Sequence, residues 1–387
     1  MPALLLEDCL QPVTAPSRAQ AFLDEACPPT PCLAIDLSVV AVRYAELTAA
    51  LPGVGAYYAV KACPEPKVVR ALGRLGSCFD VASPGEIDLC LAEGVSPSRL
   101  SYGNPVKKHR DIAKAFEQGV RQFVVDSAPE VAKLAAAAPG ASVLVRLAAD
   151  GTGSSWPLDG KFGCPPAVAF ELVTAAADLG LDPAGLAFHV GSDQRDPSRW
   201  SPAIATAAEV FERAAAAGIG LRKLDVGGGF PGHYVDPVAP IASYGAAIEE
   251  AIERYFGGAR PELLCEPGRH LVADAGVLRS EVVLVAMRGG RRWVYLDAGR
   301  FGGLAETEGE AICYQLATRR PGPSGSVVLA GPTCDSVDVL YKRSRCELPL
   351  ALDAGDIVDI LGAGAYTASY ASVGFNGFDP PVVYCME

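Results

Sequence analysis

The sequence predicts an α/β protein, a (β/α)8 TIM barrel followed by a β-rich domain, and three observations predict this. Between residues 33 and 270, apolar runs typical of buried strands alternate with helical stretches rich in Ala and Leu, giving eight β/α units. No early Gly-x-Gly-x-x-Gly turn is present, which favours the barrel over a doubly wound open sheet. Beyond residue 270 little helical pattern remains, and β-type runs are joined by loops.

The expected barrel strands each finish close to a polar residue or a glycine. In chain order they end near Lys61, Asp80, Gly103, Asp126, Arg146, His189, Gly227 and Glu266. The expected helices between them are Lys67–Leu75, Pro84–Ala92, Pro129–Ala138, Ala167–Leu179, Ala203–Ala217 and Tyr244–Phe256. Because the carboxyl ends of barrel strands form one mouth, where active sites lie, these strand ends are the candidate site.

The second domain is expected to be a β-sandwich or β-barrel-like domain formed by residues 271–387 and completed by 1–32, which are too few to form a domain alone. Its expected strands are Leu278–Met287, Arg292–Leu296, Gly325–Ala330, Ile357–Leu361 and Pro381–Tyr384. Within the barrel segment, the loop Ala149–Cys164 is rich in Gly, Ser and Asp and follows a strand. Lids and binding segments occur at such places.

Composition excludes several classes of function. The net charge of −12 disfavours nucleic acid as a partner. The twelve cysteines form no Cys-x-x-Cys and no Cys/His cluster with zinc spacing, so we expect no metal site and mostly free thiols. The chain begins without a signal-peptide pattern and has no apolar stretch of ~20 residues, which predicts a cytoplasmic protein without a membrane span.

Lys61 is the most informative of the strand-end residues. It closes the run Ala56–Ala62, which otherwise reads as a buried strand, and the turn signal Cys63-Pro64-Glu65-Pro66 follows. Burying an ammonium group without a partner costs several kcal/mol, so desolvation at a barrel mouth would lower its pKa and free a nucleophilic amine. A strand-end lysine that reaches out to water is an equally good reading of this segment alone.

Three further strand ends carry polar groups. The run Leu224–Gly232 contains three consecutive glycines, which favour a backbone cradle for phosphate over a plain turn. Glu266 and Arg269 follow the eighth strand, where a structural ion pair is the competing reading. His189 and Ser192 follow the sixth strand; a lone histidine is more often a core residue, but its position at this mouth favours a functional role.

Together these groups are the parts that hold pyridoxal phosphate: an amine for a Schiff base, a phosphate cradle, an acid for the ring nitrogen and an imidazole platform. The sequence here resembles the fold type III pyridoxal-phosphate decarboxylases, which include the ornithine, diaminopimelate and arginine decarboxylases and share the alanine racemase-like barrel. The resemblance runs from Thr30 to the C-terminus. Its motifs are Tyr58–Ala62, Phe79–Glu86, His189–Ser192, Asp225–Phe230, Glu266–Arg269, Gly331–Asp335, Gly364–Thr367 and Phe375–Phe378.

The resemblance implies a role for each matching residue. Lys61 forms the Schiff base, His189 stacks on the ring, and Glu266 pairs with the ring nitrogen. The remaining cofactor contacts implied are Ala59, Asp80, Arg146, Ser192, Gly228, Gly229, Arg269 and Tyr366. It also implies a homodimer with shared active sites, in which Cys334 protonates the substrate α-carbon and Asp335 binds the distal ammonium group. Phe375 and Tyr314 are implied to line the substrate site.

The motifs around Cys334 also bear on the substrate. Cys334-Asp335 and the segment Asp297–Thr307 resemble ornithine decarboxylases, whereas diaminopimelate decarboxylases carry Glu after the Cys. The first choice is therefore L-ornithine, giving putrescine and CO2 for polyamine synthesis. One departure is Gln315, which stands where eukaryotic ornithine enzymes have an Asp that grips the distal amine. Lysine, or a modified or carrier-bound amino acid, is the alternative.

Two other classes of protein remain open. Some relatives of ornithine decarboxylase have lost catalysis and act by binding a partner, but this chain retains Lys61, Glu266 and Cys334. Alanine racemases have a similar barrel, but they place an Arg beside the ring nitrogen of the cofactor, which makes the ring a weaker electron sink. Glu266 therefore disfavours a racemase.

Overall fold

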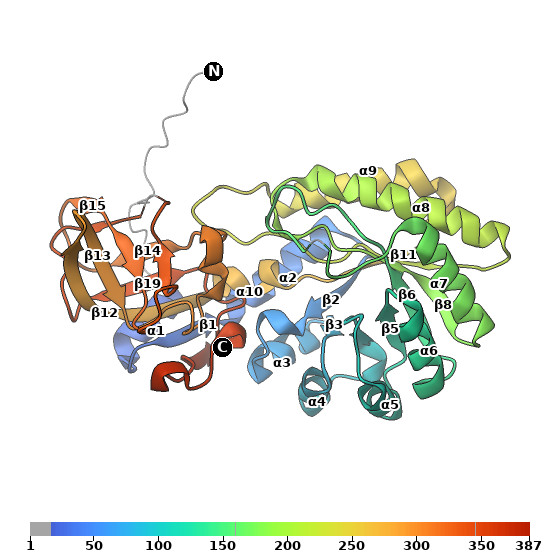
Figure 1. The fold of residues 1–387 in the computed structure, drawn as a ribbon, viewed down its shortest axis with the longest axis horizontal. Helices are drawn as coiled ribbons and strands as arrows, with labels where there is room; N and C mark the ends of the chain where they lie inside the picture. Colours follow the sequence, from blue (N-terminus) through green and yellow to red (C-terminus); the bar gives the residue numbers. More distant parts are fainter. Residues whose placement is uncertain (1–16, 159, 345) are drawn as a thin grey trace, which may run out of the picture. The chain divides into compact units, whose positions relative to one another are not determined.

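The structure is a computed structural model that describes residues 17–158, 160–344 and 346–387. The chain divides into two compact units, which we name by their architecture. The barrel unit contains Val40–Pro231 and Val238–Leu271. The sheet unit contains the described residues up to Val39, Gly232–Pro237 and Val272–Glu387. Figure 1 shows both units and labels many of their helices and strands.

The barrel unit confirms the predicted closed barrel of eight parallel strands. Around the ring the order is β10-β11-β2-β3-β4-β5-β6-β8. The strands are β2 (Gly55–Ala59), β3 (Cys78–Val81), β4 (Leu100–Tyr102), β5 (Gln122–Val125), β6 (Ser142–Arg146), β8 (Asp182–Ala187), β10 (Lys223–Asp225) and β11 (Glu262–Cys265). Each ends within a few residues of the position that the sequence predicts.

Helices surround this ring of strands (Figure 1). They are α2 (Leu37–Ala50), α3 (Pro66–Arg74), α4 (Pro84–Ala92), α5 (His109–Glu117), α6 (Ala128–Ala137), α7 (Pro166–Asp178), α8 (Trp200–Ala216) and α9 (Ile241–Phe256). Local signals explain where they begin: α4 has proline at its first position, and the Ser83 side chain accepts a hydrogen bond from Glu86 N–H.

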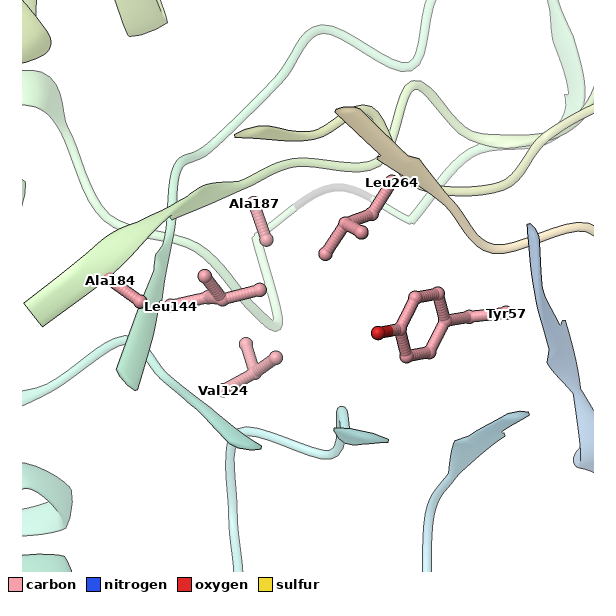
Figure 2. Close-up of a cluster of buried hydrophobic side chains, with 6 residues drawn as sticks. All are labelled: Tyr57, Val124, Leu144, Ala184, Ala187 and Leu264. Carbon is pink, nitrogen blue, oxygen red and sulfur yellow. The ribbon is translucent and has the colours of Figure 1, made fainter. Parts of the chain in front are cut away.

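Side chains from several strands fill the interior of the barrel. Tyr57, Val124, Leu144, Ala184, Ala187 and Leu264 form one buried cluster (Figure 2). A packed interior of this kind leaves no pore. The functional groups therefore lie at the mouth, above a tightly packed core that holds them rigidly.

The sheet unit is built on a sheet with the order β14-β19-β12-β13-β16-β17. Its strands are β12 (Gly276–Arg288), β13 (Arg291–Leu296), β14 (Gln315–Thr318), β16 (Val328–Ala330), β17 (Val339–Tyr341) and β19 (Ile357–Leu361). Two more strands branch from it: β1 (Cys32–Asp36) pairs with β12 and with β20 (Val382–Met386). A separate pair is formed by β15 (Ser324–Ser326) and β18 (Glu347–Pro349).

The structure differs from the sequence prediction in two places here. The predicted strand Gly325–Ala330 is two strands, β15 and β16, which pair with different partners. The predicted barrel segment begins at residue 33, yet β1 hydrogen-bonds to β12 and β20 in the sheet unit. The physical reason is that β1, buried along its whole length, has the same local pattern as a barrel strand, so only its pairing distinguishes the two.

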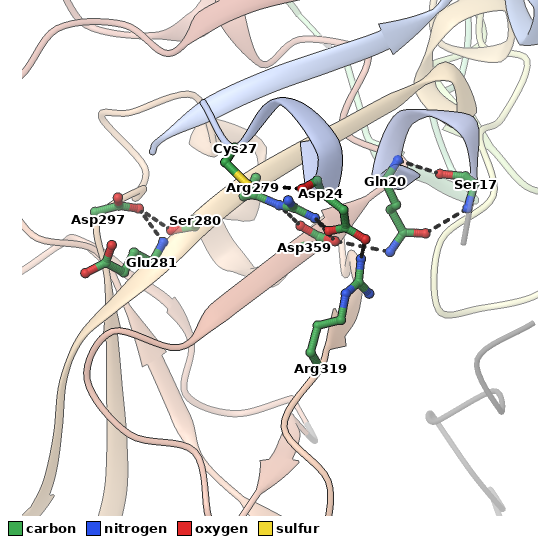
Figure 3. Close-up of polar contacts among 10 residues, drawn as sticks. All are labelled: Ser17, Gln20, Asp24, Cys27, Arg279, Ser280, Glu281, Asp297, Arg319 and Asp359. Carbon is green, nitrogen blue, oxygen red and sulfur yellow. Dashed lines mark hydrogen bonds and ion pairs between the residues drawn. The ribbon is translucent and has the colours of Figure 1, made fainter. Parts of the chain in front are cut away.

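An ionic cluster fastens α1 (Arg18–Ala26) to the sheet (Figure 3). Arg279 of β12 donates from Nε and Nη2 to the Asp359 carboxylate at 2.7 and 2.9 Å, and from Nη2 to Asp24 at 2.8 Å. Gln20 Nε2 also donates to Asp359, at 3.2 Å. The start of the described chain is therefore part of the sheet unit's buried polar core.

No helix within the described ranges is long and apolar enough to cross a membrane.

Candidate active site

Lys61 and Asp80 meet at the carboxyl ends of neighbouring strands. Lys61 lies in a single turn of 3-10 helix, Val60–Ala62, directly after β2, and Asp80 lies in β3. Lys61 Nζ is 2.8 Å from Asp80 Oδ2. Asp80 is buried, and within the described ranges its other oxygen, Oδ1, has no hydrogen-bond partner. The pair thus leaves an acceptor oxygen available beside an amine.

The structure corrects the sequence interpretation of how Lys61 is activated. Its side chain keeps 44% of its surface exposed, because it leaves the strand and turns along the mouth. The ion pair with Asp80 stabilises the ammonium form, whereas the interpretation from sequence relied on desolvation. The neighbouring carboxylate therefore positions the amine, and burial is not what distinguishes it.

Two carboxyl groups lie deeper, at the ends of β10 and β11. Asp225 is the last residue of β10, and Glu266 directly follows β11. A side-chain hydrogen bond joins them. Burial, reinforced by Asp225 and Asp80, raises the pKa of Glu266 well above its ordinary range, although Lys61 and Arg146 oppose this. Burial likewise raises the pKa of Asp225, to about 7.

His189 lies two residues beyond β8. Its Nδ1 accepts a hydrogen bond from Gly191 N–H at 3.1 Å, so in the neutral ring Nε2 carries the proton. Burial, together with Arg146 and Lys61, holds the pKa of His189 well below its ordinary range. The imidazole is therefore neutral at pH 7, and a neutral flat ring suits stacking on a heterocycle.

The triple glycine has a packing reason that the sequence did not reveal. Gly227 has φ +71°, and a Cβ there would lie 2.0 Å from the Phe188 carbonyl oxygen. At Gly228 a Cβ would lie 2.6 Å from the Glu266 carbonyl oxygen and 3.0 Å from His189 Nε2. These contacts alone require glycine, so phosphate binding by Gly228 and Gly229 stays a prediction.

Arg269 and Ser192 come together from different strand ends. Arg269 Nη2 donates to Ser192 Oγ at 3.0 Å, and the arginine is only 3% exposed. A buried guanidinium beside a hydroxyl is a suitable site for an anionic oxygen. Ala59, the last residue of β2, donates its N–H to Pro267 O at 3.0 Å, which ties the Lys61 turn to the segment that carries Glu266 and Arg269.

Arg146, the last residue of β6, borders a cavity of about 240 Å³ that Asp150, Phe162 and His189 also line. Its guanidinium lies 5.4 Å from the centre of the Phe162 ring. Part of the loop predicted to carry a lid or binding segment forms a short strand, β7 (Ser154–Trp156). This strand pairs with β9 (Ser192–Gln194), so the loop is anchored beside Ser192.

The other predicted site residues belong to the sheet unit. Cys334 and Asp335 are exposed on the loop after β16, and Cys334 N–H donates to Asn376 Oδ1 at 2.9 Å. Phe375 packs on Phe301, with ring centres 4.3 Å apart, and both line a cavity of about 210 Å³. Tyr314 is buried with its ring against Tyr234. Tyr366 has φ +54° and packs against Tyr370.

The sequence alone indicated no role for three residues near the barrel mouth. Asp225 stood in a quoted motif, but nothing local indicated that its carboxyl meets Glu266. Gly103 was noted only as a strand end; a Cβ there would lie 2.0 Å from Asp80 Oδ1, so the glycine leaves room for that carboxylate. Glu86 accepts a hydrogen bond from Ala82 N–H at 2.6 Å, and burial raises its pKa to about 7.

Comparison with known proteins agrees with this site. Residues 37–273 match the family of the pyridoxal-dependent decarboxylase, pyridoxal binding domain. The lysine/ornithine decarboxylase of Selenomonas ruminantium is 37% identical over 90% of this chain and 88% of its own. Antizyme inhibitor 2 of Xenopus laevis is 34% identical over 91% and 80%. The crystal structure of lysine/ornithine decarboxylase from Vibrio vulnificus complexed with cadaverine superposes with a TM-score of 0.86 at 35% identity, covering 96% of this chain and 99% of that one.

The barrel, its amine and its acidic groups define an enzyme of the pyridoxal-phosphate class. The chain belongs to the pyridoxal-dependent decarboxylase family, and it is a pyridoxal-phosphate-dependent amino-acid decarboxylase. The residues present fit the cofactor. An amine held by Asp80, a deep carboxyl group at Glu266, a neutral His189 and a buried Arg269 provide groups suited to an aldehyde, a ring nitrogen, a ring face and a phosphate.

Proposed function

We propose that this chain decarboxylates a basic L-amino acid, with L-ornithine as first choice and putrescine and CO2 as products. The observation that carries the proposal is the meeting of Lys61, Asp80, His189 and Glu266 at one barrel mouth. The relatives named for lysine and ornithine decarboxylation support the class of substrate. Both ornithine and lysine present a distal ammonium group, so lysine is the alternative.

The chain's residues have distinct tasks in this reaction. Bound pyridoxal phosphate supplies the electron sink that accepts the electron pair when the carboxylate leaves the α-carbon. Lys61 holds the cofactor aldehyde, and Asp80 keeps the amine in place. Glu266 keeps a proton at the ring nitrogen, and His189 covers one face of the ring. We assign phosphate binding to Ser192, Arg269 and Tyr366 with the amides of Gly228 and Gly229.

A second part of the proposal is that two chains build each active site. Cys334 and Asp335 are exposed in one chain, which suits residues that act in a partner's site. Mixing Lys61→Ala with Cys334→Ala tests this, because a heterodimer contains one site free of both substitutions. Random exchange would restore about a quarter of wild-type activity. A mixture as inactive as its components would refute shared sites.

The distal end of the substrate depends on the acidic groups of the sheet unit. Gln315 Nε2 donates to Tyr234 O at 2.7 Å, so this amide is engaged in a structural bond. Glu310 accepts backbone hydrogen bonds from Lys342, Arg343 and Ser344, which occupies its carboxylate. Glu306 is only 3% exposed. Asp335 and Glu308 remain the exposed candidates, and we assign the distal ammonium group to Asp335.

A CO2-release assay across ornithine, lysine, arginine and diaminopimelate tests the substrate. We expect ornithine to give the highest kcat/KM, and Asp335→Asn to lower it through KM while Glu308→Gln changes little. Preference for diaminopimelate would refute the assignment of Asp335. A preference for a modified or carrier-bound amino acid would instead agree with the neutral Gln315.

The relative named as an antizyme inhibitor keeps a binding protein as the second candidate. The absorbance spectrum of the purified protein distinguishes a decarboxylase from a binding protein. We expect visible absorbance that borohydride bleaches and that Lys61→Ala lacks. Colourless protein that neither takes up pyridoxal phosphate nor releases CO2 would favour binding over catalysis.

A further inference from the structure

Asp225 and Glu266 are brought together by backbone pairing that continues past the ends of their strands. β10 and β11 are parallel neighbours, with Asp225 opposite Leu264. Beyond them, Val226 N–H donates to Leu264 O at 2.9 Å and Glu266 N–H donates to Gly227 O at 2.8 Å. Both side chains therefore start from rigidly held positions, and the separation of the two carboxyl groups is fixed by the barrel itself.

The Asp225 carboxylate is further fixed from its own chain. Its Oδ1 accepts a hydrogen bond from Gly227 N–H at 2.9 Å, and the residue is 1% exposed. The side-chain hydrogen bond to Glu266 uses the same carboxyl group. Two carboxylates have only acceptor atoms, so a hydrogen bond between them requires that one carries a proton.

The charges around this pair do not remove the need for that proton. Facing groups that can titrate or carry charge are Tyr57, Lys61, Asp80, Arg146, His189 and Cys265. His189 is neutral, and Lys61 is directly paired with Asp80. Lys61 and Arg146 both oppose the raised pKa of Glu266, and Arg146 opposes that of Asp225, yet both pKa values remain raised in this poorly solvated site.

We propose that Asp225 and Glu266 hold one proton in common, which makes Asp225 a positioning residue that fixes the charge and orientation of Glu266. The aspartic-protease dyad shows the same physics, since two adjacent carboxyl groups in a low-dielectric site cannot both ionise. The inference deepens the proposed function, because it concerns the acid assigned to the ring nitrogen. Because the hydrogen bond lowers the pKa of Asp225 while the pKa of Glu266 is raised well above its ordinary range, the Glu266 O–H donates to the Asp225 carboxylate when no cofactor is bound. A cationic ring nitrogen beside Glu266 would draw this proton toward Asp225 and leave the Glu266 carboxylate ionised and held in position.

Infrared spectroscopy of the full chain freed of cofactor tests the shared proton without any turnover. At pH 7 we expect the pair to give the carbonyl stretch of one protonated carboxyl group, shifted in heavy water, in addition to the band of Glu86. Asp225→Asn and Glu266→Gln should each abolish it, because each leaves a single carboxyl group beside an amide donor. The remaining acid should then titrate at least about one pH unit lower.

Glu86→Gln is the matched control, because Glu86 is another barrel acid whose pKa is raised, to about 7. Glu86→Gln should remove only the carbonyl band of Glu86 itself. The band of the Asp225–Glu266 pair, which Asp225→Asn abolishes, should remain. Loss of the signal in one of the two pair variants but not the other would assign the proton to a single residue and overturn the proposal. Persistence of the signal in both variants would overturn it as well.

Isotope labelling decides the question even if a variant does not fold. Carbon-13 at the side-chain carboxyl of aspartate should shift the band, and so should carbon-13 at that of glutamate, because the proton bridges both groups. A shift with only one label would contradict sharing. If the chain showed the infrared band of the Asp225–Glu266 pair and yet released no CO2 from any amino acid, that result would refute the proposed function and leave the shared proton unaffected.

The cofactor-loaded enzyme provides a readout that a purely structural role would not move. We expect Asp225→Asn to shift the pH midpoint of the visible absorbance by about one unit or more while retaining the cofactor, because the amide keeps the hydrogen bond but not the proton. Asp225→Ala should loosen the cofactor as well. Identical pH midpoints in wild type and Asp225→Asn would refute the positioning role.

Discussion

Buried acidic groups are used in opposite ways in the two units. In the sheet unit, Asp359 accepts hydrogen bonds from Arg279 and Gln20. At the barrel mouth, Asp225 and Glu266 are hydrogen-bonded to each other, and the pKa of each is raised. The contrast teaches that a buried acid supplied with donors serves the fold, whereas acids crowded together at a strand-end mouth mark the chemistry.

The same contrast holds for the direction of the pKa shift. Burial would raise the pKa of Glu310, yet hydrogen bonds from Ser344, Lys342 and Arg343 outweigh it and lower the pKa to about 2. Burial of Glu86 is opposed by one backbone hydrogen bond and by Lys61, and its pKa rises to about 7. Burial disfavours the charged form of both acids, and the hydrogen-bond donors around each one decide whether that penalty is outweighed.

The largest effect should come from the amine at the barrel mouth. Lys61→Arg keeps a cation beside Asp80 but cannot bond to an aldehyde, so kcat should fall on the order of 10⁴-fold. Steady-state CO2 release measures it. Lys67→Arg, an exposed lysine on α3, is the control and should stay near wild type. Activity within tenfold of wild type in Lys61→Arg would mean that another residue holds the cofactor.

The next effect concerns stability and the ionic cluster of the sheet unit. Arg279→Met leaves the buried Asp359 without its cation and should lower the free energy of unfolding by about 3–5 kcal/mol. Arg320→Met is the matched control, because its pair with Asp356 includes an exposed arginine and should therefore contribute little to stability. Urea unfolding of both variants gives the comparison, and equal losses would contradict it.

A replacement of both partners sharpens this prediction. Arg279→Met with Asp359→Leu removes the uncompensated charge, so the double variant should recover much of the loss. A double variant as unstable as Arg279→Met would show that packing of the arginine stem, and not charge, holds α1 to the sheet.

Glu86 gives a smaller, pH-dependent effect in the barrel unit. The folded state raises its pKa from 4.5 to about 7, so the folded state binds the proton more tightly than the unfolded chain. The contribution to stability is therefore present at low pH and is lost as pH rises from about 4.5 to about 7. Each pKa unit is worth about 1.4 kcal/mol, so the rise from 4.5 to about 7 gives a total of about 3–4 kcal/mol.

Glu86→Gln isolates that dependence, because the amide oxygen still accepts the hydrogen bond from Ala82 N–H. The variant should match wild type near pH 4.5 and exceed it in stability at pH 8. Urea unfolding at both pH values measures the difference. A difference that is the same at both would show that Glu86 does not titrate in this range.

The sequence predicted the barrel well because its signals are local. Each strand is an apolar run closed by a turn residue, and the parallel barrel then places all carboxyl ends at one mouth. The predicted boundary at residue 33 placed most of β1 on the barrel side, because a fully buried apolar run looks the same in either unit and only its pairing with β12 and β20 separates the two. The three-residue strands β15, β17 and β18 are too short for any periodic pattern to show.

The site was predicted less completely than the fold, for a related reason. Lys61, His189 and Glu266 were selected as candidates because their side chains are unusual at the end of an apolar run. The link between Asp225 and Glu266 was missed because it depends on the direction of two side chains on different strands, and no local pattern carries that information. For Lys61 the sequence left a desolvated and a solvent-exposed side chain equally open, because the strand pattern does not reveal the 3-10 turn that follows β2.

The smallest effect tests how the sheet unit positions a site residue without burying it. Cys334 N–H donates to Asn376 Oδ1, and Asn376 holds φ +51°. Asn376→Asp keeps the acceptor, Asn376→Gly keeps only the backbone freedom, and Asn376→Ala keeps neither. A lost hydrogen bond is worth about 1 kcal/mol, so kcat should fall about fivefold in Asn376→Gly and further in Asn376→Ala, with Asn376→Asp near wild type.

The readout that separates positioning from general damage is the fate of the α-carbon. If Cys334 supplies the proton there, loosening its loop should raise the share of turnovers that release CO2 without yielding the amine product. Amine and CO2 measured together give that share. Equal shares in wild type and Asn376→Gly would show that the hydrogen bond does not position Cys334. A defect in Asn376→Ala alone would assign the residue's role to its backbone conformation. At the barrel mouth, rigid strands hold the side chains. We therefore expect loss of a single loop contact there to change the share of turnovers without amine product much less.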